Sequence, residues 1–191
     1  MARSLTVRRI HKWDIFSTER VPQARFLVGQ PDLLRQCIPA MEHLARPLFI
    51  AWMLQITVQN ALRHRGDIHL LDDYWMKPFA AEVVHGIDEG WLIETASLLP
   101  QPDLVIYLDV DPQSALARKS VRTPYECGRD TERSPASFVS HQAKQRAQLQ
   151  RWARTRAWAQ VDANRSRDEV FDQIIECVQK TPGWRRLRGE S

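Results

Sequence analysis

Two hydrophobic patterns alternate along the chain: short runs rich in apolar residues, and longer segments in which apolar residues recur every three or four positions. The first pattern is typical of strands and the second of helices that bury one face. The runs predict strands at 5–10, 68–72, 104–110 and 157–163. The periodic segments predict helices at 31–45, 47–64, 77–86, 88–98, 135–156 and 166–180, and Pro39 should break or bend the first of these. Strands that alternate with helices predict an α/β domain with a parallel sheet.

Polar residues mark the ends of several of these elements. Asp111 and the proline after it predict the start of a helix, because a carboxylate caps the first turn and proline fits its first position. Ser166 and Glu169 have the spacing of a capping box before the last helix. The run LVIYLDV at 104–110 is nearly continuous in apolar residues, which predicts a parallel strand covered on both faces. A polar loop is expected at 122–133.

The composition is that of a globular protein with one core: 191 residues, 43% hydrophobic and 26% charged. We expect a single domain over 1–181, followed by a basic tail at 182–191 that holds part of the net charge of +4. The most apolar segment, 47–62, is interrupted by two glutamines and an asparagine, so it predicts a buried helix and not a membrane span. The three cysteines lie far apart and the N-terminus has no signal-peptide pattern, which indicates a reduced, cytoplasmic protein without disulfides or structural zinc.

Two apolar runs end on a carboxylate. Asp72 ends the run IHLLD and is followed by Asp73, Tyr74 and Trp75, whereas Asp109 stands near the end of LVIYLDV. In open parallel sheets, ligands bind outside the carboxyl ends of the strands, so both acids are expected at that edge. Acids after strands also cap the next helix, which is the structural alternative. The functional interpretation is preferred for Asp72, and both interpretations stay open for Asp109.

Cations gather in the segment ALARKSVRTPYECGRDTERS, which holds Arg118, Lys119, Arg122, Arg129 and Arg133. Guanidinium groups bind phosphoryl oxygens through two parallel hydrogen bonds, so arginines on a loop after a strand–helix unit suit a polyphosphate. They would also stabilise the charge that develops during phosphoryl transfer. The alternative is a solvated loop, in which exposed ion pairs with the interleaved acids contribute little.

The order of these segments resembles the thymidylate-kinase-like members of the P-loop nucleotide kinases, over roughly 5–180. LLDDYW stands where that family has a strand-ending Asp-Arg-Tyr. LPQPDLVIYLDVDPQSALARK resembles the family's Pro-Asp, its strand ending in Leu-Asp-Val, and the helix that leads to a lid arginine. LFIAWMLQ resembles the helix that contacts the nucleobase, and VDANRSRDEVFDQI resembles the closing strand and C-terminal helix. The resemblance implies a three-layer α/β fold, with a parallel sheet between layers of helices.

The resemblance also implies ATP-dependent phosphoryl transfer to a nucleoside monophosphate or a related nucleotide or nucleoside, with Mg²⁺. Asp72 would lie near the attacking phosphate and would bind the magnesium ion. Arg118 and Arg122 would be lid arginines that reach the transferred phosphoryl group, within a lid segment at about 118–135. Further side chains would shape the acceptor pocket, stack on the base or bind phosphate: Phe49, Tyr74, Trp75, Lys77 and Arg129.

Three departures from the family pattern bear on this expectation. No G-x-x-x-x-G-K-[ST] occurs among the seven glycines, so these 191 residues cannot form the loop whose amides and lysine hold the β- and γ-phosphates. Asp73 stands where the family has an arginine, which reverses the charge where the acceptor phosphate would be held. Trp52 and Met53 replace the family's Asp-Arg pair in the base-contacting helix. A cationic or less phosphorylated acceptor, such as a nucleoside, would suit the extra carboxylate better.

In the family, the phosphate-binding loop follows a first strand in the middle of the sheet, and 5–10 matches the second strand. Without that central strand, each unmade buried hydrogen bond would cost roughly 1–3 kcal/mol, against a total stability of about 5–15 kcal/mol. Either the native chain begins upstream of Met1 and carries the loop there, or the sheet closes in a rearranged order. We expect the first. As written, the chain should show little or no ATP-dependent activity.

Other functions remain open at this point. A truncated or degenerate relic without catalytic activity would bind a nucleotide or a protein partner. Nucleic-acid binding through RWARTRAW at 151–158 and the basic tail is not favoured, because helical spacing places Trp152 on the same side as Leu149, which is typical of core packing. A homodimer through 47–62 and simple burial of this segment are both compatible with the sequence.

Overall fold

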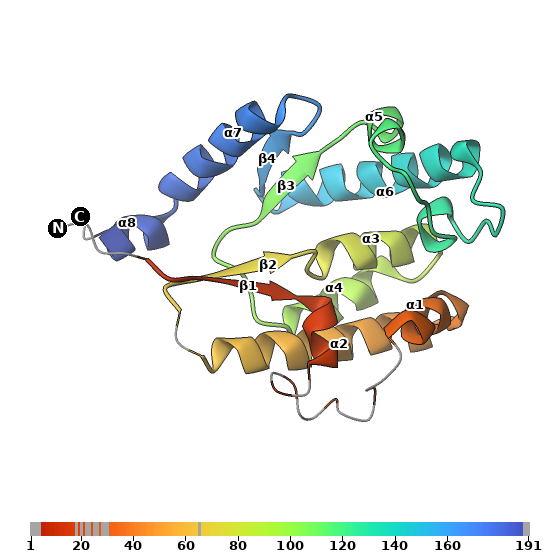
Figure 1. Ribbon diagram of the computed structural model, residues 1–191, viewed down its shortest axis with the longest axis horizontal. Coiled ribbons are helices and arrows are strands. Elements are labelled where there is room, and N and C mark those ends of the chain that lie inside the picture. Colours follow the sequence, from red (N-terminus) through yellow and green to blue (C-terminus); the bar gives the residue numbers. More distant parts are fainter. Residues whose placement is uncertain are drawn as a thin grey trace. The chain divides into compact units, whose positions relative to one another are not determined.

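The computed structural model describes residues 5–17, 19, 21, 24, 27, 31–64 and 66–188. It is an α/β protein with short parallel sheets and helices (Figure 1). The chain forms two compact units, residues 3–101 and residues 102–191, which we call the N-terminal and C-terminal units. Each unit contains one pair of parallel strands in its described residues.

The N-terminal unit is built on β1 (Val7–His11) and β2 (Ile68–Asp72). The parallel register pairs Val7 with Ile68 and His11 with Asp72, so the carboxyl ends of the two strands lie side by side. The helices of this unit are η1 (Lys12–Phe16), α1 (Pro31–Ala40), α2 (Ala45–Leu62), α3 (Met76–Val84) and α4 (Glu89–Ser97). Because β1 runs directly into η1, the first residue of η1 follows the strand end beside β2.

Helix α2 is the centre of the N-terminal unit and packs on β1, η1, α3 and α4. Its buried Met53 belongs to an apolar cluster whose other members come from η1 and the segment after it: Ile15, Val21 and Ala24. Phe49 and Trp52 pack against this cluster. The burial of α2 confirms the interpretation of 47–62 as a helix inside the protein. Within the part of the chain that the structure describes, no helix combines the length and the apolarity needed to cross a membrane.

A fully buried ion pair joins α2 to α3. Arg46 Nε lies 2.6 Å from Glu82 Oε1 and Arg46 Nη2 lies 2.7 Å from Glu82 Oε2, and both side chains are 0% exposed. Arg46 Nη1 also donates to the carbonyl oxygen of Met41 at 2.6 Å. This two-point geometry satisfies both carboxylate oxygens, as a buried charge requires. The pair fixes the first turn of α2 against the last part of α3.

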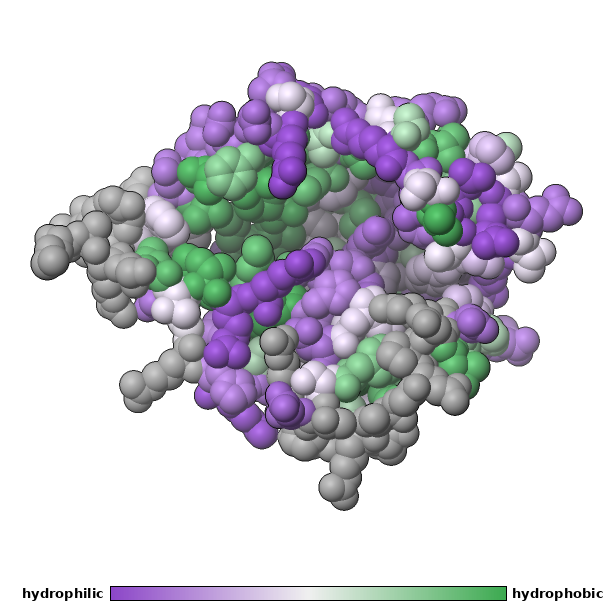
Figure 2. Space-filling model, viewed as in Figure 1, coloured by the Kyte–Doolittle hydropathy of each residue, from purple (hydrophilic) through white to green (hydrophobic). Residues whose placement is uncertain are grey.

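The C-terminal unit is built on the parallel pair β3 (Ile106–Asp109) and β4 (Ala159–Asp162). Its helices are α5 (Pro112–Ala117), η3 (Tyr125–Cys127), α6 (Pro135–Thr155), α7 (Arg167–Gln179) and α8 (Pro182–Arg188). Helix α6 packs on β3 and α5, and α7 packs on β4. Figure 2 shows apolar surface over α7 and the strands of this unit, where exposed apolar side chains are Leu108, Phe171 and Ile175.

The sequence patterns located these elements correctly. The four predicted strands correspond to β1, β2, β3 and β4, and the predicted helices are present with ends shifted by a few residues. Asp111 caps α5, and Ser166 forms a capping box with Glu169 at the start of α7, as predicted. Helix α1 ends one residue after Pro39, which confirms the expected break. Trp152 is buried, in agreement with core packing.

One expectation about β3 is wrong. The continuous apolar run predicted burial on both faces, but the strand is half-buried and Leu108 is 45% exposed. The cover of a strand's faces depends on the elements packed on them, and among the described residues α6 is the helix that packs most on β3. Residues 182–188 of the basic tail form α8.

Candidate functional site

Two acid–base pairs lie at the carboxyl ends of β1 and β2. Asp72 Oδ2 accepts a hydrogen bond from Arg9 Nη2 at 2.5 Å, and Asp73 Oδ2 accepts one from Lys12 Nζ. Both cations come from β1 or the residue after it, and both acids come from the end of β2. The side chains of the first pair are 68% and 49% exposed, so this pair contributes little to stability. The second pair is better shielded, at 19% and 24%. The four side chains together carry no net charge.

Asp73 has an uncommon backbone conformation. Its φ of 58° lies in the left-handed region, which aspartate tolerates better than most residues but which still costs free energy. Its Oδ1 is buried without a hydrogen-bond partner among the described residues, and so is the hydroxyl of Thr57 on α2. Both side chains line a cavity of about 10 Å³, together with Ile10, Lys12, Leu54, Val58, Leu71, Asp72 and Tyr74. A cavity of this size has room for one water molecule or one hydroxyl group.

The two aromatic residues after the acids face the interior. Tyr74 is 6% exposed, and its hydroxyl donates to the carbonyl oxygen of Pro100 at 3.0 Å. Burial raises the pKa of the Tyr74 hydroxyl above its usual range. Trp75 is 3% exposed and packs on Phe79, with ring centroids 6.2 Å apart. Tyr74 thus forms one wall of the cavity and ties β2 to the segment before β3, while Trp75 belongs to the core.

Phe49 and Lys77 are the other predicted pocket residues of this unit. Phe49 is half-buried on α2, and its ring centroid lies 5.8 Å from that of Trp52. Lys77 is exposed on the first turn of α3. Their predicted roles, base stacking and phosphate binding, remain predictions.

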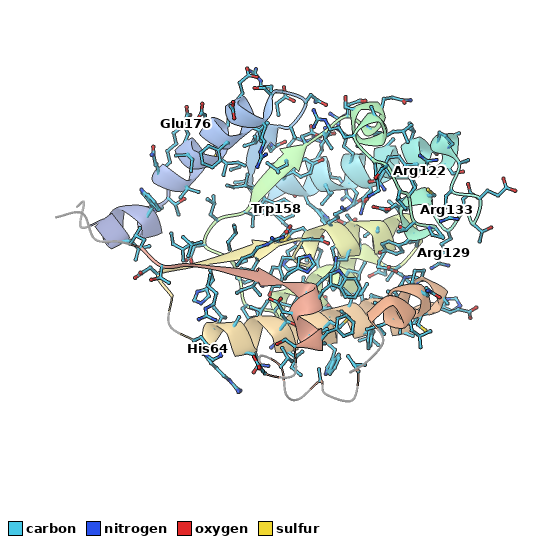
Figure 3. The ribbon with its side chains drawn as sticks, viewed as in Figure 1. His64, Arg122, Arg129, Arg133, Trp158 and Glu176 are labelled. Carbon is cyan, nitrogen blue, oxygen red and sulfur yellow. The ribbon has the colours of Figure 1, made fainter. Side chains whose placement is uncertain are left out.

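The predicted lid segment, about 118–135, presents arginines that have no carboxylate partner among the described residues. Arg118 Nη1 donates to the carbonyl oxygen of Ala163 at 2.7 Å, which fixes this side chain on the loop after β4. Arg122 Nε donates to the carbonyl oxygen of Arg133 at 2.9 Å. Arg122, Arg129 and Arg133 come from the segment around η3 (Figure 3), and Arg129 and Arg133 both have positive φ.

The acids interleaved with these arginines have other partners. Burial alone would raise the pKa of Glu126, but hydrogen bonds from Lys119 and Thr123 hold it below its usual value. Hydrogen bonds from Ser137 and from its other neighbours lower the pKa of Asp130 to about 2. The alternative of an ion-paired loop therefore fits Lys119 and not the arginines. That these arginines bind an anion remains a prediction.

Asp109, for which both interpretations were open, has a structural role. Its carboxylate accepts hydrogen bonds from Arg146 Nε at 2.6 Å, from Gln150 Nε2 at 2.8 Å and from the Tyr107 hydroxyl at 3.2 Å. Burial raises the pKa of Asp109, yet the hydrogen bonds from Arg146 and Gln150 outweigh that effect and hold the pKa below its usual value. The carboxylate joins α6 to the end of β3 and has little capacity left for a ligand.

The predicted site residues therefore form two groups. Asp72, Tyr74, Trp75, Lys77 and Phe49 belong to the N-terminal unit. The lid arginines Arg118, Arg122 and Arg129 belong to the C-terminal unit. That Asp72 and the lid arginines surround one shared anion remains a prediction.

Asp72 is the carboxylate that would hold a metal ion. One of its oxygens is paired with Arg9, and the other makes no hydrogen bond or ion pair with the described residues. No cluster of three histidine, cysteine or acidic side chains suited to a metal occurs among those residues. Magnesium commonly takes one or two carboxylates and completes its shell with water and substrate phosphates, so Asp72 fits an ion that arrives with a nucleotide.

Three residues of this site were not expected from the sequence: Arg9, Lys12 and Thr57. Arg9 and Lys12 are near the end of a predicted strand, in RRIHK, and parallel pairing with the run that ends at Asp72 brings them beside the acids. That signal can be used only when the register of the two strands is known. No sequence pattern distinguishes Thr57, because it is one of several polar residues in an otherwise apolar helix.

Thymidylate kinases are similar to this chain in sequence, although no family model matches it. The probable thymidylate kinase 1 of Saccharolobus solfataricus is 27% identical over 136 residues, which cover 71% of this chain and 63% of that protein. The thymidylate kinase of Schizosaccharomyces pombe is 28% identical over 150 residues, which cover 77% and 68%. The probable thymidylate kinase of Sulfurisphaera tokodaii is 32% identical over 73 residues, which cover 38% and 34%. The chain thus spans less than two thirds of the length of the Saccharolobus protein.

Proposed function

We propose that this chain, which is thymidylate-kinase-like over most of its length, takes part in phosphoryl transfer from ATP to a nucleotide or nucleoside acceptor. The observation that carries the proposal is the position of Asp72. It ends β2 at the edge where parallel α/β proteins bind ligands, and it keeps one carboxylate oxygen without a partner among the described residues.

In this proposal the N-terminal unit binds the acceptor. Asp72 orients the acceptor group and holds Mg²⁺, which when bound neutralises charge on the transferred phosphoryl group. Tyr74 and Trp75 shape the pocket from the inside, Phe49 contacts the base, and Lys77 supplies a cation at the rim.

The lid arginines act on phosphate oxygens. The guanidinium groups of Arg122 and Arg129 have no carboxylate partner among the described residues, and a forked guanidinium matches the geometry of a phosphoryl group. Arg118 is held on the loop after β4 by the carbonyl oxygens of Ala163 and Asn164 at 2.7 and 3.4 Å, so its position is the most fixed of the three.

The proposal also includes a three-layer nucleotide-kinase-like domain over 1–181 with a lid. It further includes a cytoplasmic location and the use of ATP and Mg²⁺. The loop that holds donor phosphates does not occur in these 191 residues. We therefore expect the chain by itself to bind an acceptor and to transfer phosphate slowly or not at all.

The test measures acceptor binding and transfer separately. The purified chain is titrated calorimetrically with four deoxynucleosides and their 5′-monophosphates, and is then incubated with these acceptors, Mg²⁺ and labelled ATP. We expect saturable binding of an acceptor class, and any transfer should require Mg²⁺ and be lost in Asp72→Asn. The matched control is Asp172→Asn, an exposed aspartate on α7, which should leave both readouts unchanged. The absence of saturable binding by any acceptor would contradict the proposal.

A non-catalytic relic that binds a nucleotide or a protein partner is the second candidate. It is favoured by Trp52 and Met53, which pack in or against the apolar cluster instead of supplying an Asp-Arg pair. An in-frame strand and glycine-rich loop upstream of Met1 would support the enzyme. An in-frame stop close to Met1, together with acceptor binding and no transfer, would support the relic.

A further inference from the structure

Two buried polar atoms near the end of β2 have no partner among the described residues, and they line the same cavity. Asp73 Oδ1 is an acceptor, and the Thr57 hydroxyl is both a donor and an acceptor. A threonine inside a helix commonly bonds to the carbonyl one turn back, but Thr57 does not, although it is only 2% exposed. Buried polar groups are nearly always hydrogen-bonded, so two orphans beside one cavity indicate an occupant that bonds to both.

The backbone at Asp73 supports the same conclusion. Left-handed conformations of residues other than glycine persist where the surrounding structure holds them, and they cluster at ligand sites. Lys12 Nζ donates a hydrogen bond to Asp73 Oδ2, while Asp73 Oδ1 remains at the cavity. Because Lys12 engages Oδ2, Oδ1 is the oxygen of this side chain that can accept a hydrogen bond from an occupant of the cavity.

The charges at the carboxyl ends of β1 and β2 exclude a phosphate group from the cavity. Each acid already has one cation: Arg9 pairs with Asp72 and Lys12 pairs with Asp73. A phosphate dianion placed beside them would add negative charge that neither cation is available to neutralise. A neutral hydroxyl group adds no charge, and the cavity of about 10 Å³ has room for it.

We propose that Asp73 and Thr57 bind the 5′-hydroxyl group of the acceptor, and that the acceptor is therefore an unphosphorylated nucleoside and not a nucleoside 5′-monophosphate, whose 5′-oxygen already carries phosphate. This inference rests on the proposed function and narrows its substrate class. The acceptor hydroxyl donates to Asp73 Oδ1 and accepts from the Thr57 hydroxyl. Lys12 is a positioning residue that holds Asp73 in place.

Calorimetric titration of the full chain tests this assignment. The probes are thymidine, deoxycytidine, deoxyadenosine and deoxyguanosine, each compared with its 5′-monophosphate. The variants are Asp73→Asn, which keeps the shape and tolerates the left-handed backbone, and Thr57→Val, which removes only the hydroxyl. Asp172→Asn on α7 is the matched control. Circular dichroism and melting curves establish that each variant is folded.

The wild type should bind a nucleoside at least about tenfold more tightly than its monophosphate. A tenfold ratio of affinities corresponds to one hydrogen bond to a charged group. Asp73→Asn should weaken nucleoside binding by roughly tenfold and strengthen monophosphate binding, because Lys12 loses its carboxylate partner. Thr57→Val should weaken nucleoside binding roughly three- to tenfold without strengthening monophosphate binding.

The contrary results are distinguishable. If both variants lower the melting temperature but leave every affinity unchanged, the cavity holds a structural water molecule and the inference is overturned. Preferred binding of the monophosphate, followed by transfer to it, overturns the inference and leaves the proposed function standing. Failure of both acceptor classes to bind overturns the inference and the proposed function together.

Discussion

The buried ion pair between α2 and α3 leads to a quantitative prediction. Replacing Glu82 by glutamine keeps the shape of the side chain and removes its charge. Arg46 then keeps its bond to the Met41 carbonyl but has lost a charged partner at 2.6 and 2.7 Å. Both side chains are 0% exposed, so water does not screen the uncompensated guanidinium.

The expected cost is about 3–5 kcal/mol, the usual effect of breaking a buried pair from one side. Since a domain is stable by only about 5–15 kcal/mol, Glu82→Gln should remove a large part of the stability of the N-terminal unit. An apolar replacement of both partners, Arg46→Met with Glu82→Leu, leaves no buried charge. Such replacements are often neutral, so the double variant should recover most of the loss.

Urea denaturation followed by tryptophan fluorescence measures these differences. The matched control is Glu176→Gln on α7, whose ion pair with Lys180 is exposed and should change stability by less than about 0.5 kcal/mol. A cost of less than about 1 kcal/mol for Glu82→Gln, or a double variant as unstable as the single one, would contradict this prediction.

Three smaller predictions concern local features. Hydrogen bonds, the largest effect being that of Ser137, lower the pKa of Asp130 from 3.8 to about 2. The ionised Asp130 carboxylate therefore stabilises the fold fully above about pH 4, and this stabilisation is lost as the pH falls towards 2. The difference in melting temperature between the wild type and Asp130→Asn should therefore shrink over that interval, and a difference independent of pH would contradict this. Ser166→Ala removes a helix cap and should cost about 1 kcal/mol in denaturant unfolding, with no loss expected if the cap is unimportant. Tyr74→Phe leaves the Pro100 carbonyl without its donor and should cost about 1 kcal/mol in the same assay, so an unchanged midpoint would argue against this bond.

Local features of the fold could be predicted from the sequence because they depend on neighbouring residues. The spacing of Ser166 and Glu169 specifies a helix start regardless of the rest of the chain, and the cap at Asp111 follows from the same kind of signal. The run IHLLD contains all of β2. Burial was less predictable. The apolar run around Leu108 predicts a covered strand, but coverage depends on which elements lie beside it.

The candidate site could be predicted only in part, for a related reason. Asp72 was identified because it ends an apolar run. Its partner Arg9 lies 63 residues earlier, and Lys12 lies 61 residues before Asp73, so neither pairing follows from local spacing. Local spacing also does not specify that the turn into α3 directs Trp75 into the core.

We propose above that the carboxyl ends of β1 and β2, with α2 packed on β1, form an acceptor site. Titration of the ¹⁵N-labelled chain with a deoxynucleoside, followed by amide NMR spectra, tests it most directly. We expect saturable shifts at 10–12, 57 and 71–74, with little change on α7. Shifts confined to other parts of the chain, or no saturable shift with any deoxynucleoside, would contradict it.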